Sequence, residues 1–483
     1  MRNFSYKALM CIAFLAFSSS SFASFSDAQT PKLKPDFGAS DVGLPSVPED
    51  RIDIYNYYKL EFLEDGYPGK KADDERVTPH PIYGAYLIYD YLRLYEETND
   101  EVYRQAAVKV ADAAMARMEY IEDHDALAFY YDESDGLTYF PNKFFSGLTQ
   151  VRYLVPFYRV YKASNDPKYA QAAKQIFNSL KIPETDGGVL VNTPYGIAVE
   201  EYPHSIPTYV LNGWTSIVLE LLKYEDLAED NEAGLFARSN IKTIERLLAS
   251  YDHPATFLSR YQLTGFIYIK FIFNLPRSCK PLEFETIFGE KSYGLGKEGN
   301  RWSNYVLSKD IEEDGYPTHR QFLVNGVFSQ INSEHAFMVN LECRQSGATV
   351  DIYLANGDYD PKVSAMPTKR WIWLDQKSLE VGENKFTIAA DKDNFDMIGY
   401  PTNFAKEIAG EARNVYHWLH ITNFEKILGY LNSREIAYYT AKWTEYTKAW
   451  KSLPVLQRDD LSYDIPPGSI KSRQVIKEFH EYR

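Results

Sequence analysis

A helical segment that recurs along the chain limits the folds open to this sequence. Residues 95–107 are matched by residues 161–173, and a weaker copy covers 429–443. In the two clear copies a helical pattern ends, a Ser/Thr-Asn-Asp turn follows, and a tyrosine and an alanine pair recur at equal offsets. The first copy joins two expected helices, 82–97 and 98–118. Helical hairpins that cannot bury their apolar faces alone must stack. We therefore expect a mainly α fold, an α/α toroid (an incomplete α/α barrel).

A second pattern interrupts the helices between about 265 and 405. Residues 335–358 alternate apolar and polar side chains around a Ser-Gly turn, and residues 369–392 repeat the pattern. Alternation with a period of two is typical of half-buried strands. Helical periodicity returns at Tyr416. The sequence thus predicts an antiparallel β-sandwich inserted into the α/α toroid at a surface loop.

The start of the chain has the features of a secretory signal. Arg2 and Lys7 form a basic region, residues 8–17 are apolar but too short to span a bilayer, and Ser21-Phe22-Ala23 is a candidate cleavage site. We expect an exported protein, periplasmic or secreted. The expected divisions are a signal peptide (1–23), a linker (24–50), the first part of the toroid (51–264), the inserted sandwich (265–405), the last part of the toroid (406–455) and a C-terminal tail (456–483).

Charge and composition limit the kinds of partner that this protein can bind. The 483 residues carry a net charge of −15, and such a surface repels nucleic acid and anionic membranes, so we expect neither partner and no membrane span. An anionic substrate stays compatible with this charge, because local basic residues can line a cleft. Aromatic residues make up 15% of the chain, which suits carbohydrate contacts as well as core packing. Cys279 and Cys343 either pair in an oxidising compartment or remain buried thiols. The sequence is compatible with a homodimer.

The segment GIAVEEYPHSIPTYVLNGW, residues 196–214, is the first candidate site. Pro203 and Pro207 exclude a regular helix before about residue 208. Glu201 therefore lies on irregular backbone just ahead of a helix, and Asn212 lies in the first turns of that helix. A ring of helices opens its central cleft at such a place. The simpler interpretation is a pair of solvated loop acids.

Three further segments carry candidate side chains. VYHWLHITNF (415–424) places Tyr416, His420 and Asn423 on one helical face, with His417 three residues before His420. A metal site would need a further His or Cys ligand at suitable spacing, which the sequence does not offer, so we expect no metal. The other two segments are YDHPATFLSRYQL (251–263), with Arg260 and Tyr261, and FFSGLTQVRYLVPFYRVY (144–161), with Gln150.

Taken together, these segments resemble the C-terminal catalytic domain of the glucuronyl C5-epimerase family. The blocks YGIAVEEYP and YVLNGW resemble its central Glu-Glu-Tyr-Pro and Leu-Asn-Gly signature. In the same order along the chain, the other segments resemble its Ser-x-x-x-Gln, Tyr-Asp-Leu and Tyr-His-x-x-His-Ile elements. This chain differs in having Gln262 in place of the acid of Tyr-Asp-Leu. It also differs in carrying its β unit inside the helical domain, between Tyr261 and Tyr416.

The residue types and the resemblance together indicate acid–base chemistry on a uronic-acid-containing polysaccharide. Epimerisation at C5 of a hexuronate removes a proton on one face of the ring and returns one on the other, and preorganised donors neutralise the enediolate. A carboxylate and a phenol, Glu201 and Tyr416, suit the two proton transfers. The resemblance implies that this work falls on Glu201, Tyr202, Tyr261 and Tyr416. The expected substrate-binding residues are Asn212, Gln150, Arg260, His417 and His420. No cofactor is needed for this chemistry.

Two other functions compete with epimerisation. If the enediolate expels the C4 oxygen, the enzyme is a polysaccharide lyase that cleaves by β-elimination. A non-catalytic glycan-binding protein is the third possibility, with Trp371 and Trp373 on one face of the β unit, where they equally suit a sandwich core. A glycoside hydrolase would need two carboxylates flanking the bond, and no spacing supports a partner such as Asp135 for Glu201.

Overall fold

The computed structural model describes most of the chain between residues 36 and 450. The segments outside the description are 1–35, 52–54, 57–58, 72–75, 132–142, 204–206, 255–256, 277–278, 289–290, 295–308, 314–315, 330–333, 345–346, 356–370, 390–403, 409–410 and 451–483. The expected signal peptide, the first part of the expected linker and the expected C-terminal tail lie outside the described residues. The end of the expected linker is described and is not a loose connection, because Ala39, Leu44 and Val47 are buried in the main hydrophobic core.

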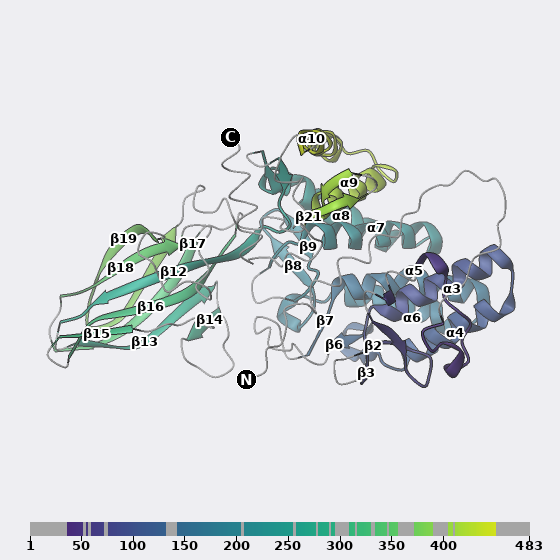
Figure 1. The fold of residues 1–483 in the computed structure, drawn as a ribbon, viewed down its shortest axis with the longest axis horizontal. Helices are drawn as coiled ribbons and strands as arrows, with labels where there is room; N and C mark the ends of the chain where they lie inside the picture. The colour runs from purple at the N-terminus through teal and green to yellow at the C-terminus, as the bar shows by residue number, and fades with distance from the viewer. Residues whose placement is uncertain are drawn as a thin grey trace.

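In the part of the chain that the structure describes, the α-helices from α3 to α10 form four hairpins. They are α3 (Tyr83–Thr98) with α4 (Glu101–Met115), α5 (Gly147–Ser164) with α6 (Pro167–Ser179), α7 (Leu211–Ala228) with α8 (Asn231–Tyr251), and α9 (Val415–Leu428) with α10 (Arg434–Trp450). The first helices of successive hairpins pack side by side in the order α3, α5, α7, α9 (Figure 1). Among the described elements, α3 and α9 form no substantial contact with each other, so these hairpins make an open row rather than a closed ring. No described helix has the length and apolar character needed to span a membrane.

The repeated turn explains why the hairpins form where the sequence predicts them. Asn99 and Asn165 end α3 and α5 in the left-handed conformation, and the N–H of each donates to the carbonyl of Tyr95 or Tyr161 at 2.7 Å. The next residue is an aspartate in both copies, and its carboxylate accepts an N–H in the first turn of the following helix. In the third copy, Ser433 accepts the N–H of Ile436 at 3.1 Å ahead of α10.

Short antiparallel hairpins come before the first helix of several of these pairs. The pairs are β4 (Glu119–Ile121) with β5 (Ala126–Ala128), β6 (Tyr130–Tyr131) with β7 (Phe144–Phe145), β8 (Leu190–Thr193) with β9 (Gly196–Val199), β10 (Asp252–His253) with β11 (Leu258–Ser259), and β21 (Phe404–Ile408) with β22 (Glu411–Asn414). A three-stranded sheet of β1 (Leu60–Phe62), β2 (Pro68–Lys71) and β3 (Val77–Pro79) precedes α3. Of these strands, β2 contacts α3, β9 contacts α7, and β22 contacts α9.

A larger β unit lies between α8 and α9 and extends to one side of the helices (Figure 1). Its strands are β12 (Thr264–Asn274), β13 (Cys279–Phe288), β14 (Lys291–Gly294), β15 (Lys309–Glu313), β16 (Tyr316–Ser329), β17 (Glu334–Cys343), β18 (Ala348–Ala355), β19 (Trp371–Leu379) and β20 (Gly382–Ala389). They form two antiparallel sheets, ordered β15-β16-β12-β18-β19 and β14-β13-β17-β20. The β interruption between the helices is therefore present in the described residues.

The two sheets share one hydrophobic core. Phe271 and Val350 from the first sheet pack in the same cluster as Phe337 and Ile388 from the second. Strands that are adjacent in sequence, such as β17 and β18, belong to different sheets, so these two strands do not form a hairpin with each other. A disulfide bond joins Cys279 and Cys343, which lie opposite each other on β13 and β17.

Candidate active site

The loop between β9 and α7 is held in place by Glu200. Its carboxylate accepts hydrogen bonds from the Thr208 N–H and hydroxyl, both at 2.9 Å, and from the Tyr209 N–H at 3.0 Å. The two prolines keep this loop out of regular structure, so its N–H groups need side-chain acceptors. Burial raises the pKa of Glu200 to about 7, and the same hydrogen bonds pull it back down. Glu200 is therefore a structural acid, buried rather than solvated.

The next residue, Glu201, is buried in a different way. Its backbone carbonyl accepts the Ser146 hydroxyl at 2.8 Å, which ties it to the start of α5. Its side chain lies against Gly213 in the first turn of α7, where a Cβ atom would sit 2.3 Å from Oε2. Among the described residues, Oε2 has no hydrogen-bond partner although the side chain is only 2% exposed. A buried carboxylate oxygen without a partner is rare and calls for an explanation beyond packing.

Burial changes the acidity of Glu201. Burial and, to a smaller extent, the neighbouring Glu200 raise the pKa of this carboxyl, Tyr202 and Arg152 lower it, and together these effects bring it to about 8. At pH 7 the side chain is therefore mostly protonated, and near pH 8 both protonation states are populated. A group in this condition exchanges protons readily with a substrate at neutral pH.

Two of the predicted tyrosines, Tyr202 and Tyr261, are electrostatic neighbours of this carboxyl, and the third, Tyr416, lies against Tyr261. Burial raises the pKa of Tyr202 and of Tyr261 well above the usual value for a phenol, and the charge of Glu201 raises both further. Tyr416 also raises the pKa of Tyr261, and the ring centroids of these two tyrosines are 4.4 Å apart with the planes inclined by 55°. Tyr261 thus has Glu201 and Tyr416 as electrostatic neighbours. The structure thus places Tyr202 and Tyr261 near Glu201, and it places Tyr416 beside Tyr261.

Further polar atoms are buried near the start of α7 and α9. Asn212 Oδ1 and His420 Nε2 have no hydrogen-bond partner among the described residues. Asn423, one turn beyond His420, donates to Thr215 Oγ1 at 2.9 Å, which fixes α9 against α7. Arg260 is buried beside Tyr261, and its backbone N–H donates to the Tyr251 carbonyl at 2.7 Å. Asn212 and His420 therefore keep polar atoms available for a ligand rich in hydroxyl groups.

Two residues of the expected substrate-binding set are engaged by the protein itself. Gln150 accepts the Phe129 N–H at 3.0 Å and donates to the Leu127 carbonyl and the Ser179 hydroxyl. His417 accepts the Ser259 N–H at 2.8 Å through Nδ1, while its Nε2 lies 2.9 Å from the Trp443 carbonyl and donates to it. These contacts give both side chains a structural role, and we do not carry them into the proposed substrate-binding set.

Sequence reasoning overlooked Arg152 and Glu220, which form a buried ion pair at 2.8 Å between α5 and α7. Arg152 also lies near Glu201 and Tyr86, since each of these groups shifts the pKa of the guanidinium. The available signal was an arginine within the apolar run of 148–157, two residues after Gln150.

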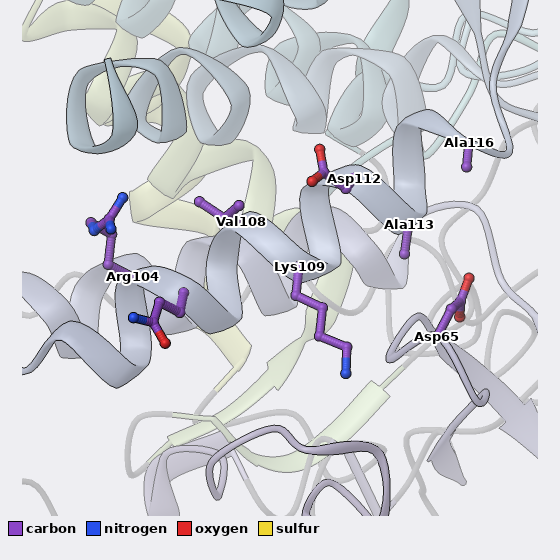
Figure 2. Close-up of a pocket in the computed structure, with 8 residues that line it drawn as sticks. Asp65, Arg104, Val108, Lys109, Asp112, Ala113 and Ala116 are labelled. Atoms are coloured by element: carbon purple, nitrogen blue, oxygen red, sulfur yellow. The ribbon is translucent and has the colours of Figure 1, made fainter. Parts of the chain in front are cut away.

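A hollow of about 540 Å³ lies elsewhere, on the surface of α4 (Figure 2). It is lined by Asp65, Arg104, Gln105, Val108, Lys109, Asp112, Ala113 and Ala116. None of the candidate catalytic residues lines it, and we assign it no function. In the described part of the chain, no group of three or more His, Cys, Asp or Glu side chains is arranged to hold a metal ion.

Comparison with known proteins agrees with the motifs. Residues 122–277 match the family described as D-glucuronyl C5-epimerase C-terminus, which confirms the resemblance for this part of the chain. The chain is 27% identical over 168 residues to the D-glucuronyl C5-epimerase of Caenorhabditis elegans, covering 31% of this chain and 27% of that protein. It is 28% identical over 109 residues to the uncharacterized protein MJ1128 of Methanocaldococcus jannaschii, covering 22% of this chain and 35% of that protein. The chain thus spans about a third or less of the length of these relatives.

Two solved structures were also compared. The GH76 alpha-mannanase BT2949 of Bacteroides thetaiotaomicron has a TM-score of 0.29 at 12% identity, covering 43% of this chain and 56% of that chain. The GH76A alpha-1,6-mannanase from Salegentibacter sp. HEL1_6 has a TM-score of 0.29 at 16% identity, covering 47% of this chain and 56% of that chain. A likeness at this TM-score supports no conclusion about activity.

The raised pKa of Glu201 predicts a pH-dependent cost in stability. Between the usual pKa of 4.5 and about 8, the folded chain keeps a proton that the unfolded chain has lost. The free energy of unfolding therefore falls as pH rises through this window and levels off above it. Glu201→Gln removes this loss, so the variant should exceed the wild type in stability by on the order of 3 kcal/mol at pH 7.

Urea unfolding of wild type and variant at intervals between pH 5 and pH 8.5 measures this effect. The stability difference should widen as pH rises. Glu122→Gln removes an exposed acid and should follow the wild type at every pH. A difference for Glu201→Gln that stays constant over this range would contradict a raised pKa in the folded chain.

Proposed function

We propose that this protein is a uronate C5-epimerase that inverts C5 of hexuronic acid residues within a polysaccharide. The observation that carries the proposal is the buried Glu201 carboxyl, which has an unpartnered oxygen and a pKa of about 8 and has the phenols of Tyr202 and Tyr261 as neighbours. The match of residues 122–277 to the epimerase C-terminus supports the same reaction. A purely structural acid would be bonded as Glu200 is.

The proposed reaction divides the proton transfers between the acid and the phenols. One of the two, Glu201 or the Tyr261–Tyr416 pair, removes the C5 proton, and the other returns a proton on the opposite face of the ring. The enediolate formed in between carries extra charge, which preorganised donors stabilise. Asn212, Arg260 and His420 bind the substrate in this scheme, and Tyr202 assists Glu201. The chemistry needs no cofactor.

The proposed architecture is an incomplete α/α toroid interrupted by a β-sandwich. The open row of helical hairpins and the core shared by the two sheets support it. We also propose that the protein is exported. The basic and apolar start of the sequence supports export, and so does the Cys279–Cys343 disulfide, because such bonds persist mainly in oxidising compartments.

One observation favours lyase activity as the second candidate. Tyr261 and Tyr416 lie ring against ring at 4.4 Å, so two phenols approach the substrate from one direction. A β-elimination can use a base and an acid from the same side, because the proton leaves C5 and the C4 oxygen departs protonated. Epimerisation, in contrast, needs the carboxyl and a phenol on opposite sides.

Incubation with uronans in deuterated water tests the proposal. We expect deuterium at C5, with the chains intact, for at least one polymer from a panel that includes heparosan-like and chondroitin-like chains. Absorbance from unsaturated uronate would show that the enzyme is a lyase instead of an epimerase. Binding without exchange or cleavage across the panel would leave the glycan-binding alternative. For that alternative, Trp373 on β19 is 57% exposed and offers an aromatic surface. Heat-denatured protein is the control for chemical exchange.

A further inference from the structure

We propose that Arg152 binds the carboxylate of the uronate whose C5 is exchanged, and that Glu220 positions it to do so. This inference rests on the proposed function and assigns the charge-binding role to a residue outside the family motifs quoted above. A hexuronate brings one negative charge into the site, and the enediolate adds a second. A cation that touches the carboxylate is therefore needed in the site.

The contacts of Arg152 leave part of its guanidinium available. Nη1 donates to Glu220 Oε1 at 2.8 Å, and this bond fixes the side chain between α5 and α7. Nε is buried and has no hydrogen-bond partner among the described residues. Arginine presents its donors as a rigid planar fork, so anchoring one arm on Glu220 sets the direction of the others. A carboxylate is the group that best fits such a fork.

The local charge balance also favours an anionic ligand. Lys223 Nζ donates to the same Glu220 oxygen at 2.8 Å, so two cations share one carboxylate oxygen. Arg152, Lys223 and Glu220 together carry one positive charge that no member of the group cancels. The Lys223 side chain is 44% exposed and is neutralised in part by water, whereas the Arg152 side chain is only 14% exposed, so Arg152 carries the excess positive charge that faces the interior and is the member of the group suited to an anionic ligand.

The position of Arg152 connects this charge to the reacting groups. Glu201 and Arg152 influence each other's ionisation, and so do Tyr86 and Arg152. The Arg152 guanidinium carbon lies 6.0 Å from the centroid of the Tyr86 ring. In the proposed site, a carboxylate bound to Arg152 brings the attached C5 to the side of the site that holds Glu201. Tyr86, whose hydroxyl is buried on α3, forms the wall beside the bound carboxylate.

The experiment compares binding of an acidic polymer with binding of its neutral counterpart. Heparosan and carboxyl-reduced heparosan are titrated against wild type and Arg152→Gln at fixed ionic strength. The wild type should prefer the acidic polymer by at least tenfold, and the variant should lose most of that preference. For any uronan that the wild type exchanges, kcat/KM of Arg152→Gln should fall by about a hundredfold, mainly through kcat.

Two further variants separate binding from folding. Arg152→Lys keeps the charge without the fork and should give an intermediate preference. Arg159→Gln removes a cation from the same helix, where its partner is the largely exposed Glu96, and should behave as the wild type. If circular dichroism shows that Arg152→Gln does not fold, the comparison rests on Arg152→Lys. The preference of Arg152→Lys for the acidic polymer must then be weaker than that of the wild type.

The outcomes distinguish this inference from the proposed function. Exchange by the wild type together with an unchanged preference in Arg152→Gln overturns the role of Arg152 and leaves the epimerase proposal standing. Loss of the preference for the acidic polymer in Arg260→Gln but not in Arg152→Gln also overturns the proposed role of Arg152. If the wild type exchanges no uronan, the epimerase proposal fails. A preference that depends on Arg152 would then still support the carboxylate site, and its absence would refute the site.

Discussion

Replacement of Glu201 by glutamine should abolish exchange at C5 almost completely, with a loss of about 10³-fold in kcat. Glutamine keeps the shape of the side chain but neither donates nor accepts a proton during turnover. The loss is measured as the rate of deuterium incorporation into a uronan that the wild type exchanges. The variant should still bind the polymer and, from the pKa of about 8, should be more stable than the wild type at neutral pH.

Glu200→Gln is the matched control, since it makes the same change one residue earlier. Thr208 donates to one oxygen of Glu200 and Tyr209 to the other, and the NH2 group that replaces one of these oxygens in glutamine cannot accept a hydrogen bond. This variant should lose about 1–3 kcal/mol of stability. At a temperature where it is folded, it should retain most of its activity. Equal losses of activity in the two variants would remove the distinction between a structural and a catalytic acid on which our proposal rests.

Gly213→Ala should cause the second large loss, although it changes no polar group. The added methyl would lie 2.3 Å from Oε2 and 2.9 Å from Cδ of Glu201, so the carboxyl must move. Displacement of a reacting group by about 1 Å can cost about 10²-fold in rate. Alanine favours the helix by roughly 1 kcal/mol, so stability should change little. Deuterium exchange and urea unfolding, measured on the same preparation, test both statements.

A compensating substitution tests the cause of this loss. Glu201→Asp shortens the acid by one methylene and withdraws the carboxyl from the position of the new methyl. The double variant should therefore lose less activity than the product of the two single losses, because the two residues are in contact. Independent losses that multiply would show that Gly213 acts on something other than Glu201.

Local chemistry made the helical part predictable. The Asn-Asp turns at residues 99–100 and 165–166 end one helix and cap the next through side chains only one or two residues away from their partners. Alternation likewise located the strands of the β unit. Sheet membership was not predictable, because β17 and β18 are adjacent in sequence yet pair with strands far along the chain.

Within the site, the sequence located the residues better than it assigned their roles. Glu200 and Glu201 are chemically identical neighbours, and only the contact with Thr208 and Tyr209 makes the first one structural. Gln150 and His417 have the residue types that bind sugars, but their partners lie in distant segments that no local pattern reveals. Arg152 gains its importance from Glu220, 68 positions later in the chain.

The β unit separates Tyr261 from Tyr416 in the chain, and the two rings nevertheless meet at 4.4 Å. During synthesis, the whole β insertion must therefore leave the ribosome before the second phenol becomes available. Contacts of such long range form late and slowly. Nascent or truncated chains should consequently be inert toward uronans until the last helical hairpin has docked. Turnover of a uronan would then indicate that folding of the chain is complete.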